Sequence, residues 1–311
     1  MGDGITRLGI DLGGTKISAI TLAPDGAVLR HLRLRTAAGD YDGTVRQIRD
    51  IVNDLAGPNA ADYSVGIGIP GSISPASGLV QNANSTWLNG RPLKADVETA
   101  LGCAVRIAND ANCFALSEAT DGAGSSHAGV FGVILGTGCG GGFVFNGRLV
   151  DGPRGIGGEW GHNPLPSPAA EEMPGPSCWC GRNGCIETWV SGPGLAADHA
   201  RASGDTLQAE EIAEAAQAGC GQAQQTLERH ASRLARSLAC IVNVLDPDCI
   251  VLGGGLSNMA HLYDTLPGLM AAHIFAEQSQ VLIVPPDHGD DSGVRGAAWL
   301  WNGSEGLAGE S

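Results

Sequence analysis

Apolar and polar positions along the chain alternate in two periods, one typical of strands and one typical of helices. Three short apolar runs near the start predict consecutive strands at residues 8–11, 17–22 and 28–34. Apolar side chains then recur at helical spacing from residue 45 to residue 55, which predicts a helix that ends at Gly57-Pro58. The apolar run 65–69 predicts a buried strand after this helix, and such alternation is typical of an α/β domain.

The same alternation continues to the end of the chain and predicts two α/β halves. We expect helices at residues 94–101, 111–119, 222–245 and 294–301, and strands at residues 104–108, 130–135, 143–146 and 250–252. The predicted N-terminal domain covers residues 1–118 and is joined by the C-terminal helix 294–302, and the predicted C-terminal domain covers residues 119–293. We expect a ligand cleft between the two domains and a flexible tail at residues 303–311.

Composition and charge limit the possible partners. The chain has 311 residues, 43% of them hydrophobic, which is enough for two cores. Its formal net charge of −15 argues against a general affinity for nucleic acid or anionic membranes, because phosphate contacts require clustered Lys and Arg. Residues 1–7 lack the basic start and apolar run of a signal peptide, and no stretch approaches the roughly 18 to 20 apolar residues of a membrane helix. We therefore expect a cytoplasmic protein with no nucleic-acid or membrane partner.

A set of soft metal ligands lies in the segment 159–187. Its members are His162, Cys178, Cys180 and Cys185. Thiolates with an imidazole favour a tetrahedral zinc ion. A disulfide between Cys178 and Cys180 would be strained because only one residue separates them, and the glycines at 181 and 184 allow the tight fold that brings Cys185 to the same ion. We expect a structural zinc site, and the alternative is a set of free or redox-active thiols.

Three glycine-rich segments follow predicted strands. They are Asp11-Leu-Gly13-Gly14-Thr15-Lys16, then Gly136-Thr137-Gly138-Cys139-Gly140, and then Gly253-Gly254-Gly255. Glycine lets backbone amides approach phosphate closely, Lys16 and the Thr15 hydroxyl add donors, and Asp11 is a ligand type that holds magnesium through water. Neither a Walker loop nor a Rossmann fingerprint is present, because Lys16 follows Thr15 and the second segment leads into a strand. Each segment alone could be an ordinary turn, but the presence of a matching loop in each half favours a nucleotide-binding site.

Further polar side chains are candidates for binding or catalysis. Asn109-Asp110 opens the predicted helix 111–119, where Asp is a preferred N-cap, and the same carboxylate can accept the proton of a substrate hydroxyl during phosphoryl transfer. We also expect Asn84, Glu159 and Glu187 around a polyol, and the alternative is that each is an ordinary surface or loop residue.

Taken together, these motifs resemble the ROK family of sugar kinases and repressors, which has the actin-like, hexokinase-like ATPase fold. The resemblance covers residues 8–301 and includes Glu159-x-x-His162 followed by Cys178-x-Cys180-Gly-x-x-Gly-Cys185-x-Glu187. Segments 68–74, 82–90 and 292–301 look closest to the bacterial fructokinases, also called manno(fructo)kinases. The resemblance therefore implies ATP-dependent phosphorylation of the 6-hydroxyl of fructose, and of mannose, with magnesium and a structural zinc ion.

The resemblance also implies residue roles and a homodimer. Asp110 would be the general base. The implied sugar-binding residues are Gly71, Asn84, Asn109, Asp110, Glu159, His162 and Glu187. The implied ATP-binding residues are Asp11, Gly13, Gly14, Thr15, Lys16, Gly136, Thr137, Gly138, Cys139, Gly140, Gly253, Gly254 and Gly255. His162 would serve twice, with one ring nitrogen on zinc and the other on a sugar hydroxyl.

Other activities remain open at this stage. Glucokinase and N-acetylglucosamine kinase are alternatives, because a single pocket residue or loop shift changes which hexose fits. The repressors of the family carry an N-terminal winged helix, whereas the first glycine segment here begins eleven residues into the chain, so a sugar-sensing regulator would lack a DNA-binding domain. An actin-like or heat-shock-type ATPase would not require the complete sugar signature in 159–187. The loop 164–177 is particular to this chain.

Overall fold

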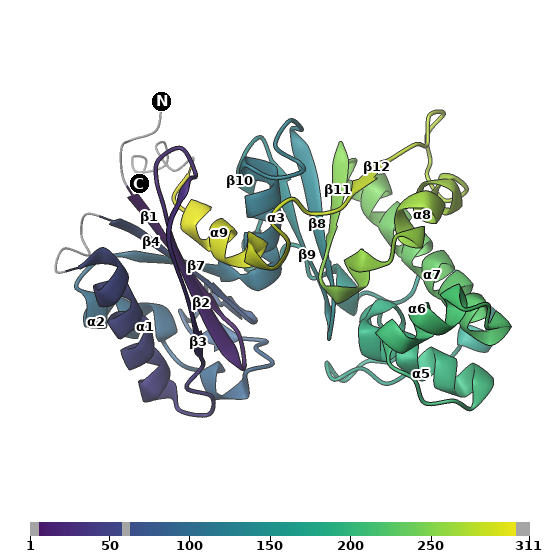
Figure 1. Ribbon diagram of the computed structural model, residues 1–311, viewed down its shortest axis with the longest axis horizontal. Coiled ribbons are helices and arrows are strands. Elements are labelled where there is room, and N and C mark those ends of the chain that lie inside the picture. The colour runs from purple at the N-terminus through teal and green to yellow at the C-terminus, as the bar shows by residue number, and fades with distance from the viewer. Residues whose placement is uncertain (1–5, 58–62, 303–311) are drawn as a thin grey trace. The chain divides into compact units, whose positions relative to one another are not determined.

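The chain divides into two compact units in the computed structural model, which describes residues 6–57 and 63–302 (Figure 1). Unit 1 comprises Met1–Ser126, Gly142–Gly158 and Asp287–Ser311, and unit 2 comprises His127–Gly141 and Glu159–Pro286. The domain boundaries expected from the sequence stay a prediction, and the expected tail at residues 303–311 lies outside the described residues.

Unit 1 is built on a five-stranded sheet with the strand order β3-β2-β1-β4-β7 (Figure 1). Its strands are β1 (Thr6–Leu12), β2 (Lys16–Leu22), β3 (Val28–Arg35), β4 (Tyr63–Ile69) and β7 (Val105–Asn109). β1, β2 and β3 pair antiparallel, whereas β4 pairs parallel with both β1 and β7. A short pair, β5 (Ser72–Ile73) and β6 (Val80–Gln81), stands apart from this sheet. The three predicted N-terminal strands are confirmed.

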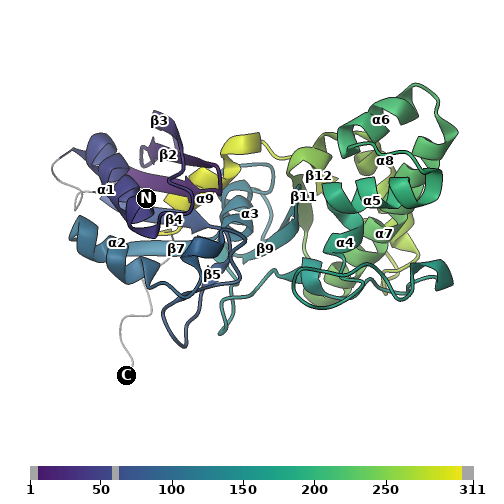
Figure 2. The same cartoon turned by 90° about the horizontal axis from the view of Figure 1, so that it is seen from below.

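Helices cover both faces of this sheet (Figures 1 and 2). α1 (Tyr41–Ala56) and α2 (Leu93–Leu101) lie on one face, and α9 (Ser292–Trp299) lies on the other, with α3 (Asp110–Thr120) packed beside it. α1 begins where Asp40 accepts a hydrogen bond from the amide of Gly43, and it ends at Gly57, whose φ of 70° favours glycine. α9 approaches the sheet at Gly9, where a Cβ atom would lie 2.2 Å from the carbonyl oxygen of Val294. The central strands β1 and β4 are therefore buried on both faces, as their short apolar runs indicate, whereas the edge strand β3 is exposed.

Unit 2 is organised around the second sheet, whose order is β10-β9-β8-β11-β12. The strands are β8 (Gly129–Leu135), β9 (Cys139–Phe145), β10 (Arg148–Leu149), β11 (Cys249–Gly253) and β12 (Leu282–Val284). β11 pairs parallel with β8 and β12. β9 passes into unit 1 at Gly142, and its unit 1 residues Val144 and Phe145 pair antiparallel with β10. The helices are α4 (Glu187–Val190), α5 (Gly192–Ser203), α6 (Ala209–Gln217), α7 (Gly221–Leu245) and α8 (His261–Ala271), and they lie on one side of β11 (Figure 2).

The sequence pattern predicted α7 but not α4, α5 or α6. α4 has only four residues, and α6 is rich in alanine, with Ile212 as its one fully buried large side chain. A helix that packs through small residues gives only a weak apolar periodicity, so the pattern fails at this point.

β9 begins at Cys139, so the prediction that this strand starts at residue 143 was wrong. Part of the glycine run lies inside the strand instead of in the turn. A Cβ atom at Gly141 would lie 2.8 Å from the indole ring of Trp160, and one at Gly142 would lie 2.9 Å from the Cα atom of Asn112. Glycine in these strand positions permits close packing of neighbouring residues.

Candidate functional site

The first glycine segment of unit 1 forms the turn between β1 and β2. The amide of Gly13 donates to the carbonyl oxygen of Lys16 at 3.0 Å, and the hydroxyl of Thr36 donates to the carbonyl oxygen of Gly13 at 2.8 Å. Gly14, Thr15 and Lys16 are exposed. The amide of Gly13 is therefore engaged within the turn, whereas the other residues that were predicted to bind phosphate, Gly14, Thr15 and Lys16, are exposed to solvent.

Asp11 lies directly before this turn in a poorly solvated position. Burial raises the pKa of Asp11, and the positive charges of Lys16 and Arg33 oppose this effect. Its carboxylate packs against two glycines, because a Cβ atom at Gly293 or at Gly68 would lie 3.4 or 3.7 Å from its oxygens. A desolvated carboxylate is stabilised by a nearby cation, which fits the predicted magnesium contact.

Unit 1 brings three of the predicted sugar-binding segments together. The side-chain amide of Asn109 donates to the carbonyl oxygen of Gly71 at 3.1 Å. Gly71 has a φ of 76°, and a Cβ atom there would lie 2.3 Å from the carbonyl oxygen of Gln81, so glycine is required. Asn84, which is exposed, lies three residues beyond Gln81.

Asn109, not Asp110, is the N-cap of α3, so the capping interpretation of Asp110 was wrong. The side-chain oxygen of Asn109 accepts hydrogen bonds from the amides of Ala111 and Asn112, at 2.9 and 3.4 Å. Asp110 is the first residue of the helix and is half-buried. Together with burial and Asp11, its charge raises the pKa of Cys113. Asp110 Oδ1 also accepts a hydrogen bond from the amide of Ala111, at 2.8 Å, so both side chains bond the first turn of α3.

Unit 2 gathers the four predicted zinc ligands in one cluster. The candidate ligand atoms of His162, Cys178, Cys180 and Cys185 all lie within 4.8 Å of one another. Cys178 Sγ lies 3.6 Å from His162 Nδ1, and Cys180 Sγ lies 3.6 Å from Cys185 Sγ. The second distance is too long for a disulfide bond. It is close to the separation of about 3.8 Å between sulfur ligands in a tetrahedral site with Zn–S bonds of about 2.3 Å. The donor set and its spacing fit zinc.

The electrostatics of this cluster favour a thiolate at one position. Burial would raise the pKa of Cys180, but hydrogen bonds involving Arg182 outweigh it and lower the pKa to about 6. A thiolate is the form of cysteine that binds zinc.

Glu187 connects the cluster to the second glycine segment. Glu187 Oε2 accepts a hydrogen bond from the amide of Cys139 at 3.0 Å, and its Oε1 accepts one from Trp179 Nε1 at 2.7 Å. A Cβ atom at Gly138 would lie 2.9 Å from the same carboxylate. Burial raises the pKa of Glu159, the nearby His162 lowers it and the nearby Glu187 raises it.

The predicted nucleotide loops of unit 2 meet at a cavity of about 350 Å³. The residues that line it are Gly136, Thr137, Gly192, Pro193, Gln208, Ala209, Glu210, Gly255 and Leu256. Gly254 beside it has a φ of 79°, and a Cβ atom there would lie 2.4 Å from the carbonyl oxygen of Leu135. The sequence reasoning missed the members from 192 to 210. The pair Gly192-Pro193 was an available signal, because proline near a helix start marks the beginning of α5.

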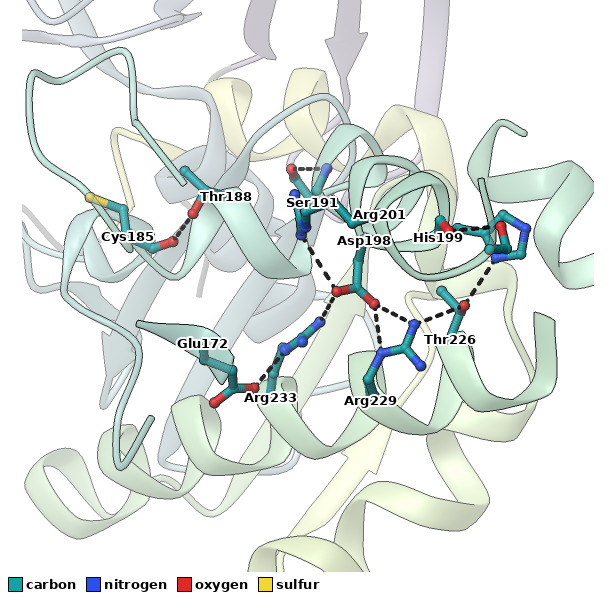
Figure 3. A network of polar contacts seen from close by, with 12 residues as sticks. Glu172, Cys185, Thr188, Ser191, Asp198, His199, Arg201, Thr226, Arg229 and Arg233 are labelled. Carbon is teal, nitrogen blue, oxygen red and sulfur yellow. Dashed lines mark hydrogen bonds and ion pairs between the residues drawn. The ribbon is translucent and has the colours of Figure 1, made fainter. Parts of the chain in front are cut away.

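A buried ionic network lies near the cluster of candidate zinc ligands (Figure 3). Arg233 of α7 donates to Glu172 at 2.8 Å and pairs with Asp198 of α5 at 2.9 Å, and its guanidinium lies 4.4 Å from the ring centre of Trp189. Burial opposes ionisation, but the guanidinium groups hold the pKa of Glu172 and of Asp198 below their ordinary values. The network ties the loop between His162 and Cys178 to α4, α5 and α7.

Of the helices in residues 6–57 and 63–302, none combines the length and the apolar composition that a bilayer-spanning helix needs.

Solved structures of known proteins share this fold. A ROK hexokinase from Thermus thermophilus superposes with a TM-score of 0.83 at 28% identity, covering 95% of this chain and 97% of that one. A ROK family glucokinase from Streptomyces griseus, in complex with glucose and AMPPNP, superposes with a TM-score of 0.74 at 28% identity, covering 95% and 98%. The predicted actin-like, hexokinase-like fold class is confirmed.

The sequence comparison corrects the predicted substrate. The N-acetyl-D-glucosamine kinase of Pasteurella multocida (strain Pm70) is 37% identical over 300 residues, which cover 95% of this chain and 99% of that protein. The interpretation of the chain as a fructokinase was therefore wrong. It depended on segments 68–74, 82–90 and 292–301, and these did not discriminate between hexoses. The sequence profile of the ROK family matches residues 7–304. The chain belongs to the ROK family.

Proposed function

We propose that the protein transfers the γ-phosphoryl group of ATP to the 6-hydroxyl of N-acetyl-D-glucosamine. The observation that carries this proposal is the likeness, over nearly the whole length of both chains, to relatives with that activity in their names. The coarser activity, that of an ATP-dependent sugar kinase, follows from the family and these relatives together.

Asp110 is the proposed general base. Its half-buried position as the first residue of α3, directly after the N-cap Asn109, supports this role. A base must be within hydrogen-bond reach of the hydroxyl whose proton it accepts, and we propose that Asn84 and Asn109 orient the sugar for that contact. The carbonyl of Gly71, held by Asn109, supports the same arrangement.

Glu159, His162 and Glu187 are the proposed sugar contacts of unit 2. The effects of His162 and Glu187 on the pKa of Glu159 support a common site for these three groups. We propose that one ring nitrogen of His162 faces the sugar while Nδ1 faces Cys178, in agreement with the 3.6 Å distance. Zinc at His162, Cys178, Cys180 and Cys185 would fix the imidazole, and its chemistry there is structural.

The nucleotide is proposed to bind the glycine loops. The cavity lined by Gly136, Thr137 and Gly255 supports a place for part of ATP in unit 2, and the exposed donors of Gly14, Thr15 and Lys16 support phosphate contacts in unit 1. Magnesium supplies charge neutralisation at phosphate oxygens, and Asp11 is the residue that would hold it. The amide of Cys139 already donates to Glu187. In this proposal Cys139 therefore does not bind phosphate with its amide, and its role is to hold the Glu187 carboxylate in place.

A kinase assay with a sugar panel tests the proposed function. ADP release would be measured with MgATP and N-acetylglucosamine, glucose, mannose, fructose or N-acetylmannosamine. We expect the highest kcat/KM for N-acetylglucosamine, and phosphorus NMR of the product should show a 6-phosphate. A higher kcat/KM for glucose or another sugar would refute the substrate assignment and leave the kinase activity standing. No ADP release with any sugar, from protein that binds ATP, would refute both.

A further inference from the structure

Trp179 is an exposed aromatic residue with an unusual position. It stands between two of the zinc-ligand cysteines, and 63% of its surface is exposed. Its neighbours Cys178 and Cys180 are less exposed, so the zinc loop presents the indole outward. Large aromatic side chains commonly stay this exposed where an apolar face meets a ligand or a partner and a polar edge is bonded.

The N–H group of the indole is hydrogen-bonded to Glu187, one of the proposed sugar-binding residues. Trp179 Nε1 donates a hydrogen bond to Glu187 Oε1 at 2.7 Å. The other oxygen of this carboxylate accepts from the amide of Cys139 at 3.0 Å. Two donors therefore fix both oxygens of Glu187, and a carboxylate held in this way presents its remaining lone pairs in one orientation.

The ring also packs on the second proposed sugar contact. The rings of His162 and Trp179 meet edge to face, with centroids 4.9 Å apart and an interplanar angle of 84°. Since His162 is half-buried and Trp179 is exposed, the indole lies on the solvent side of this pair. An exposed aromatic ring thus adjoins both Glu187 and His162 within unit 2.

We propose that Trp179 is a sugar-binding and specificity-determining residue, which rests on the proposed function. Its N–H group fixes Glu187 for contact with sugar hydroxyls. Its exposed ring provides an apolar surface for the methyl of an acetamido group, which glucose lacks. A carbohydrate site needs both elements, because hydroxyls require fixed polar partners and apolar groups require a surface free of unpaired polar atoms.

Two variants separate the two contributions. Trp179→Phe keeps an aromatic ring and removes the N–H donor, so we expect KM to rise about tenfold for both N-acetylglucosamine and glucose, while the ratio of their kcat/KM values is retained. Trp179→Ala removes the ring as well, so in this variant we also expect the preference for N-acetylglucosamine over glucose to fall about tenfold. KM for ATP and zinc content should stay at wild-type values in both.

Phe275→Ala is a matched control, because Phe275 is an aromatic residue of unit 2 that is 99% exposed. It should leave all these quantities unchanged. The inference is overturned if Trp179→Ala keeps the sugar KM and the preference within twofold of wild type. It is also overturned if the only change is in zinc content, or in the association state by sedimentation, since these indicate a structural role or a contact between copies. The wild-type sugar panel tests the proposed function separately, and the variants can be measured with whichever sugar the wild type prefers.

Discussion

We expect His230 to make the folded protein sensitive to mild acid. It lies in α7 with 1% of its surface exposed, and its Nε2 lies 3.0 Å from the carbonyl oxygen of Val190, which fixes this nitrogen as a donor. Its Nδ1 has no partner among the residues that the structure describes. Burial lowers the pKa of His230 from 6.5 to about 4, and the hydrogen bond to Val190 only partly offsets this effect. The imidazole is therefore held neutral in the fold.

The magnitude follows from the two pKa values. The unfolded chain binds a proton at His230 below about pH 6.5, whereas the folded chain binds it only near pH 4. The contribution of neutral His230 to the free energy of unfolding is therefore fully present above pH 6.5 and is lost as the pH falls towards 4. The full loss is about 3 kcal/mol, and the part between pH 7.5 and pH 5 is about 2 kcal/mol. Other groups also titrate there, including His261, whose pKa burial lowers as well. The contribution of His230 must therefore be read from a difference between variants.

His230→Gln removes the titration and keeps a donor for Val190. Urea unfolding of wild type and variant at pH 7.5 and pH 5, followed by circular dichroism, gives the loss of unfolding free energy on acidification. We expect this loss to be about 2 kcal/mol smaller in the variant. His230→Phe is the control, because it removes the donor and should be less stable at both pH values with the same small loss on acidification. An equal loss in wild type and His230→Gln would refute the reasoning.

Three further substitutions test the site and its support. Asp110→Asn is expected to lower turnover by about 10²-fold to 10⁴-fold, with an unchanged unfolding midpoint because Asn109 caps the helix. Turnover near that of wild type in the ADP-release assay would remove Asp110 from the role of base. His162→Ala is expected to lose both zinc and sugar affinity, and full zinc content by atomic absorption would contradict the shared role. Arg233→Met is expected to destabilise the fold by about 3 kcal/mol, since two buried carboxylates lose a common partner. An unchanged urea midpoint would exclude that contribution.

The secondary structure could be predicted where large apolar side chains recur at the spacing of a strand or a helix. β1 and β4 are short apolar runs, and α7 repeats buried leucines and alanines over many turns, so their pattern is unambiguous. The clustering of His162, Cys178, Cys180 and Cys185 was also predictable, because cysteine and histidine have few roles at such spacing, and their candidate ligand atoms do lie together. By contrast, α6 packs through alanines and gave no usable period.

The substrate was the part that local sequence motifs could not give. Which hexose fits depends on how side chains from separate segments are held. The proposed sugar contact Gly71 is an example of such a position, because Gln81 leaves no room for a Cβ atom there and Asn109 donates to its carbonyl oxygen. The proposed role of Trp179 also depends on contacts between segments, because in the sequence it is only the residue between two cysteines. The structure adds a 2.7 Å hydrogen bond from Trp179 to Glu187, which lies eight positions later and also accepts from the amide of Cys139. Specificity in such a site is a property of contacts between segments, so a motif that fixes the chemistry can leave the preferred sugar open.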